Sequence, residues 1–115
     1  MGLDSLQQVL EVLDELNVEY KYHSWVNIPS AHRFATWFVT SERFDGADGM
    51  VMYEDYTLVI AIYYRKFKDN EDHALERAFE SECRGAGHYT KTNGYDSENE
   101  LFSAVYTFEF KQFIS

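Results

Sequence analysis

A chain of 115 residues can build one hydrophobic core but not two, and its 45% hydrophobic and 17% aromatic content excludes intrinsic disorder. Twenty acidic residues against ten Lys plus Arg give a formal net charge of −10, which disfavours wrapping of nucleic acid and docking on anionic membranes. The single cysteine excludes a disulfide within the chain, and the opening MGLDSLQQ lacks the basic and apolar segments of a signal peptide, so we expect one domain over residues 1–115, made in a cytoplasm.

The first predicted element is an amphipathic helix over residues 5–16. Its apolar residues recur at three- and four-residue spacings: Leu6, Val9, Leu10, Leu13 and Leu16. Asp4 or Ser5 is a suitable N-cap, and Asn17 is a suitable stop.

Three strand signals follow the first helix. Apolar and polar residues alternate over 18–22, which predicts a half-exposed strand, and a second strand is predicted over 34–43. The longest β signal is Met50–Phe67, preceded by a Gly/Asp turn over 44–49. One face of this long strand carries Leu58, Ile60, Ile62 and Tyr64. We expect it to be central, covered by a helix on at least one face, and to form a hairpin with the preceding strand.

The second half of the chain adds a helix and two strands. Apolar spacing predicts a helix over 71–84, with Asp69 or Asn70 as its cap. Strands are predicted over 88–95 and 100–113, with a turn between them. The order α-β-β-β-α-β-β predicts an α+β fold: a mostly antiparallel sheet of about five strands with two helices packed on one face.

Candidate catalytic and metal-binding residues do not gather into a recognisable site. The histidines lie on different predicted elements without ligand spacing: His23, His32, His73 and His88. Cys83 falls on the apolar stripe of the second helix, which favours a buried hydrophobe over a reactive thiolate. The loop from Asp45 fails the calcium pattern, because Ala47 and Tyr56 occupy its third and twelfth positions. We therefore expect no enzyme activity, no cofactor and no metal.

Five landmarks in the chain carry a resemblance to a phage protein family. They are Phe44–Tyr53 with its Gly/Asp loop, Leu58–Tyr64, Lys68-Asp69 before an acidic helix, Tyr95–Phe102, and Val105–Glu109. On these landmarks most of the chain resembles the tail-terminator, or tail-completion, proteins of long-tailed phages and prophages, chiefly of Gram-positive hosts.

The resemblance implies a structural role. Such proteins form a hexameric ring that caps the tail tube, ends tube polymerisation and provides the joint to the head. The implied partners are other copies of the chain, the major tail tube protein and a neck or head-closure protein. DNA passes through the ring without sequence-specific binding, which fits the acidic composition. The implied location is the virion, with the host cytoplasm during assembly and no membrane.

The candidate partner-binding residues lie in and beside the Gly/Asp loop. They are Phe44, Asp45, Asp48, Gly49, Met50, Met52 and Tyr53. Loops that project from a rigid sheet often carry binding, although this loop could equally just close a hairpin. Nine Tyr and nine Phe exceed what a core of this size needs, so we expect some of them at an interface.

Other functions stay open at this point. One is a different head–tail joining or head-closure protein of the phage neck. Another is an acidic inhibitor or adaptor that mimics DNA, which would need its carboxylates along one face. A third is a small hydrolase or isomerase that joins His23 or His88 to a carboxylate.

Overall fold

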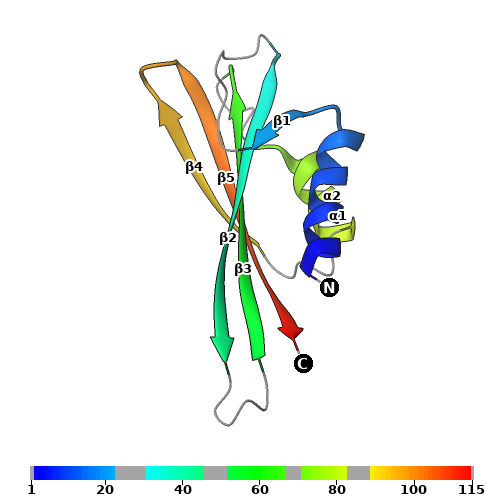
Figure 1. The fold of residues 1–115 in the computed structure, drawn as a ribbon. Helices are drawn as coiled ribbons and strands as arrows, with labels where there is room; N and C mark the ends of the chain where they lie inside the picture. Colours follow the sequence, from blue (N-terminus) through cyan, green and yellow to red (C-terminus); the bar gives the residue numbers. More distant parts are fainter. Residues whose placement is uncertain (1, 23–30, 46–51, 67–70, 83–88, 115) are drawn as a thin grey trace.

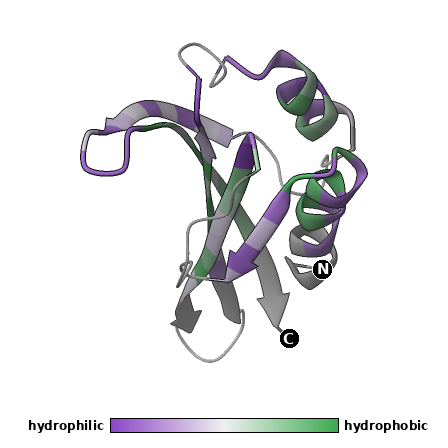
Figure 2. Ribbon diagram, turned by 90° about the horizontal axis from the view of Figure 1, so that it is seen from above, coloured by the Kyte–Doolittle hydropathy of each residue, from purple (hydrophilic) through white to green (hydrophobic). Residues whose placement is uncertain are grey.

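The computed structural model describes residues 2–22, 31–45, 52–66, 71–82 and 89–114. The elements follow the expected order and are α1 (Gly2–Glu15), β1 (Glu19–Tyr22), β2 (Arg33–Asp45), β3 (Met52–Tyr64), α2 (His73–Glu82), β4 (Tyr89–Asp96) and β5 (Leu101–Ile114). Both helices lie on the same face of one sheet (Figures 1 and 2). The predicted α+β fold is therefore confirmed.

The sheet has five strands in the order β1-β2-β3-β5-β4. β3 is the central strand, and it pairs antiparallel with β2 on one side and with β5 on the other along its whole length. β4 pairs antiparallel with β5, whereas β1 runs parallel to β2, so the sheet is mixed. The predicted hairpin of β2 and β3 and the central place of β3 are both confirmed.

The core lies between the two helices and the half of the three long strands that contains the end of β3 and the start of β5. β3 contributes the face predicted from the sequence, with Leu58, Ile60 and Ile62 fully buried. β5 and the helices complete this layer with Ala104, Tyr106, Phe108, Val9, Val12, Leu13, Leu75 and Phe79. The opposite face of β3 is only partly exposed at Val59 and Ala61, and no helix of the described chain covers it. In the described part of the chain, helices therefore cover one face of the sheet.

The first helix ends as its sequence predicts. Asn17 has a φ of 57°, the left-handed conformation that Asn tolerates better than most side chains. The amide of Val18 donates to the carbonyl of Leu13 at 2.9 Å, and that of Asn17 to the carbonyl of Asp14 at 3.1 Å. These two bonds form a Schellman motif, and the buried Val18 and Leu13 provide its hydrophobic contact.

The second helix begins later than predicted. It starts at His73, and Asp72 is its N-cap, because Asp72 Oδ1 accepts a hydrogen bond from the Leu75 amide at 3.3 Å. The prediction of a cap at Asp69 or Asn70 was therefore wrong. Both residues lie outside the described part of the chain, and the acidic run 69–72 offered three competing caps.

The three long strands extend past the helical layer. β2, β3 and β5 continue together beyond the helices as a three-stranded end, here called the projecting end (residues 40–45, 52–57 and 109–114; Figure 1). This extension makes the molecule elongated, with a longest dimension of 53 Å. The sheet thus has a core half under the helices and a half that neither described helix covers.

Candidate functional site

Strand pairing gathers part of the predicted partner-binding set at the projecting end. Phe44 of β2 pairs with Tyr53 of β3, and Asp45 pairs with Met52. The remaining predicted residues, Asp48, Gly49 and Met50, lie outside the described residues. The structure therefore brings four of the seven candidates together on neighbouring strands.

β5 adds residues that the sequence reasoning missed. Phe113 pairs with Tyr53, and Ile114 pairs with Met52. The register thus aligns Phe44, Tyr53 and Phe113 in one row across three strands, here called the aromatic row. The alternation over 100–113 marked β5 as a strand, but no local pattern could show which strand it pairs with.

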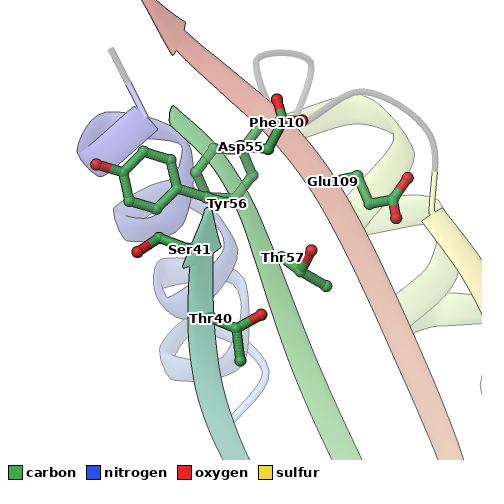
Figure 3. Close-up of a pocket in the computed structure, with 7 residues that line it drawn as sticks. All are labelled: Thr40, Ser41, Asp55, Tyr56, Thr57, Glu109 and Phe110. Atoms are coloured by element: carbon green, nitrogen blue, oxygen red, sulfur yellow. The ribbon is translucent and has the colours of Figure 1, made fainter. Parts of the chain in front are cut away.

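A hollow of about 700 Å³ lies next to this row, on the side nearer the core. It is lined by Thr40, Ser41, Asp55, Tyr56, Thr57, Glu109 and Phe110, and is here called the acidic groove. Figure 3 shows these residues on three neighbouring strands, with the Tyr56 ring directed away from Thr40, Thr57 and Glu109. The rings of Tyr56 and Phe110 stack at 5.5 Å between centroids. Cross-strand aromatic pairs of this kind stabilise neighbouring strands, and Phe110 also packs against the edge of the core.

The chemistry of the acidic groove suits binding. Its described lining offers two carboxylates, three hydroxyl-bearing aliphatic side chains and two aromatic rings. That lining includes no Lys, Arg, His or Cys to act with the carboxylates as a nucleophile and base pair. Because Asp55 and Thr57 alternate with Tyr56 along β3, the carboxylates and the rings lie on opposite faces of the sheet. The carboxylate side favours a cationic or polar group of another molecule.

The most connected polar cluster lies elsewhere, under the start of α2. Asp72 Oδ2 accepts hydrogen bonds from Arg33 Nη1 at 2.7 Å and from the Tyr64 hydroxyl at 2.8 Å. Arg33 Nη2 also donates to the carbonyl of Leu16 at 2.8 Å, so one arginine ties β2 to both helices. Burial, together with the negative charge of Asp72, raises the pKa of Tyr64. This cluster holds the helical layer on the sheet.

A second polar link joins α2 to the edge strand β4. Lys91 Nζ lies 3.0 Å from Glu76 Oε2, and it also lies 5.6 Å from the centre of the Tyr106 ring. The hydroxyl of Tyr106 is buried and has no hydrogen-bond partner among the described residues. Burial, with the nearby charge of Glu76, raises the pKa of Tyr106. Both clusters have clear structural partners and do not open onto the acidic groove.

The candidate catalytic and metal-binding residues are only partly placed by the structure. His32 and His73 are exposed, whereas His23, His88 and Cys83 lie outside the described residues. Within the described ranges, no group of three or more His, Cys, Asp or Glu side chains is arranged to hold a metal ion. None of the described helices is long and apolar enough to cross a membrane.

Comparison with known proteins gives no assignment. The chain matches no protein-family model, and it matches no curated protein.

Proposed function

We propose that this protein is a structural subunit of the phage tail-terminator type, which assembles into a ring on the end of a tail tube. The observation that carries the proposal is the projecting end. Three paired strands leave the helical layer together, and their register brings the backbone positions of Phe44, Tyr53 and Phe113 into one row. Aromatic residues are enriched at the centres of protein interfaces.

The position of this surface supports contact with a large partner. The row lies at one end of a molecule that is 53 Å long, beyond the part of the sheet that the helices cover. A neighbour can therefore contact it without disturbing the buried core. The end of a folded sheet is also a rigid platform, which lowers the entropy lost on binding.

The composition supports the passage of DNA. A formal charge of −10 gives a ring of such subunits a surface that repels phosphate, so DNA would move through its lumen without being held. The proposed partners are other copies of the chain, the major tail tube protein and a neck or head-closure protein. No enzymatic step, cofactor or metal is part of this role.

Electron microscopy of tail tubes tests the proposal. Purified protein is added to tubes polymerised from the major tail protein, and negative-stain images are compared with tubes alone. We expect a ring at one end of each tube and an arrest of further growth. Protein that stays monomeric at high concentration and leaves tube ends and tube growth unchanged would overturn the proposal. Binding to filled heads with no binding to tube ends would favour a head-closure protein instead.

A further inference from the structure

The strand β4 forms one edge of the sheet. It pairs antiparallel with β5 over Tyr89–Asp96, and in the described part of the chain it has no backbone partner on its other side. Figure 1 shows it at the margin of the sheet, away from β1. In an edge strand every second residue directs its N–H and C=O groups outward. β4 therefore presents a row of backbone donors and acceptors along its whole length.

The features that protect an edge strand from pairing are missing in β4. It contains no proline, and its register with β5 runs without a bulge from Tyr89 to Asp96. The opposite edge is different, because β1 has only four residues and carries exposed charges at Glu19 and Lys21. β4 is therefore the edge of this sheet to which another strand can add.

The two charged residues of β4 are already engaged within the molecule. Lys91 Nζ lies 3.0 Å from Glu76 Oε2, and Asp96 Oδ2 accepts a hydrogen bond from the side-chain amide of Asn99 at 2.8 Å. Their formal charges also cancel, so β4 is a neutral strand in a chain of formal charge −10. Copies of so acidic a chain repel one another, and a neutral strand is a place where two of them can come together.

An exposed aromatic ring lies on the same strand. Tyr95 is 55% exposed, and among the described residues Tyr22 is the other large apolar side chain that is exposed to a similar degree. The ring of Tyr95 packs on that of Phe102 in β5, with 4.7 Å between centroids. A ring that is exposed and already held in place loses little entropy when a partner covers it.

We propose that β4 pairs antiparallel with β4 of a second copy and so joins two molecules into a dimer with one continuous sheet. A second copy supplies a neutral edge strand of equal length. The twofold axis is then normal to the sheet, and the helices of both copies lie on the same face. The inference does not rest on the ring proposal, because β4 pairs with residues 101–108 of β5 and the projecting end uses 109–114.

Two registers satisfy this symmetry, over residues 89–95 or 90–96. Opposed residues must point to the same face, so the axis passes through a residue, either Thr92 or Asn93. With the axis at Thr92, Tyr95 lies opposite Tyr89 of the other copy, and with the axis at Asn93 it lies opposite Lys91. Both registers bring a side chain of the partner against the exposed ring, and neither opposes like charges. The acidic turns that follow β4 come to lie at opposite ends of the contact.

A substitution at the edge tests the contact by mass. Thr92→Lys places a charge at the axis or next to it, close to the same charge of the other copy, as in natural blocked edges. Gln8→Lys changes the formal charge equally at an exposed position of α1 and is the matched control. Sedimentation is measured at rising concentration, after circular dichroism shows that each variant is folded. We expect dimers for the wild type and the control, and about tenfold weaker association for Thr92→Lys.

Cross-linking through cysteine identifies the register. In a Cys83→Ser background, Thr92→Cys and Asn93→Cys are each oxidised, and the disulfide-linked dimers are separated by mass. The residue on the axis faces its own copy, with about 4.5–5.5 Å between the two Cα atoms, which a disulfide can span. We expect rapid cross-linking at one of these two positions and none at Gln8→Cys in the same background.

The dimer and the ring proposal fail separately. A wild type that stays monomeric up to its solubility limit overturns the β4 contact, even if β4 then takes up a strand of another protein. Thr92→Lys that dimerises as tightly as the wild type overturns it, as do equal losses in Thr92→Lys and Gln8→Lys, or no cross-linking at either cysteine. Tube binding is scored apart from these results. A wild type that dimerises through β4 but forms no ring on tail tubes supports the dimer and overturns the proposed function.

Discussion

Arg33 of β2 and Asp72 at the start of α2 form the shortest ion pair described in this fold, with 2.7 Å between Nη1 and Oδ2. They are 39 residues apart in the sequence. The same carboxylate caps α2 and accepts the Tyr64 hydroxyl, and the same guanidinium reaches the carbonyl at the end of α1. One contact therefore connects both helices to two central strands.

Removing the charge of Asp72 should destabilise the fold. In Asp72→Asn the cap is retained, but Arg33 loses its counter-ion, and we expect a loss of about 2 kcal/mol in the free energy of unfolding. Asp72→Ala should cost about 1 kcal/mol more, because the cap of α2 is lost as well. Urea denaturation measures both values. Glu71→Gln, next to it and exposed, is the control and should change stability by less than about 0.5 kcal/mol. Equal stability of Asp72→Asn and wild type would contradict the assigned role.

Two buried tyrosines should respond in opposite ways to loss of the hydroxyl. Tyr64→Phe removes a 2.8 Å hydrogen bond to Asp72, and we expect a loss of about 1 kcal/mol. Tyr106→Phe removes a buried hydroxyl that lacks a partner, so its stability should be unchanged or higher. Thermal and urea unfolding compare the two variants side by side. Equal losses for both would mean that the Tyr106 hydroxyl is hydrogen-bonded in the folded state, with the neighbouring Glu76 as the candidate acceptor.

Stability should fall in alkaline solution. Burial and the hydrogen bond to Glu80 raise the pKa of Tyr89 to about 12, and the pKa values of Tyr64 and Tyr106 are also raised. An unfolded tyrosine ionises near pH 10, so above that pH the unfolded state binds fewer protons than the folded state. The free energy of unfolding therefore decreases as the pH rises from about 10 to 12, and the tyrosines contribute no such decrease below about pH 9. Urea titrations across this range should show a shallower decrease for Tyr64→Phe with Tyr106→Phe than for the wild type. Parallel curves would contradict the assigned cause.

Assembly should depend on the aromatic row more than folding does. Tyr53→Asp places a charge in the row, at the end of β3 that extends beyond the helical layer. We expect loss of rings and of tube binding, with circular dichroism and thermal unfolding close to wild type. Tyr95→Asp is the matched control, because Tyr95 is a 55% exposed tyrosine near the opposite end of the sheet, and it should assemble normally. Unfolding of Tyr53→Asp would show that this row belongs to the core and not to an interface.

Local patterns predicted the elements of this fold well. Period-two and helical spacing placed every strand and helix to within a few residues, because burial of one face determines the spacing of apolar side chains. Asn17 was correctly predicted as the stop of α1, since a left-handed end favours Asn. The pairing of β5 with β3, the parallel β1 and the Arg33–Asp72 contact depend on residues far apart in sequence. No local pattern specifies these.

The candidate surface was predicted only in part for the same reason. The Gly/Asp loop drew attention to Phe44, Asp45, Met52 and Tyr53, which the register brings together. Phe113 joins them only through the pairing of β3 with β5. The acidic groove likewise combines residues from three strands, and its two carboxylates, Asp55 and Glu109, are ordinary surface acids in the sequence.

The mass of the purified wild-type protein tests the central claim most directly. Sedimentation is measured over a wide range of protein concentration, with and without tail tubes, and the particles are then imaged in negative stain. The ring proposal predicts closed rings of about six subunits, in solution or at tube ends. A protein that remains a monomer at every concentration, and that does not bind tubes, would contradict it.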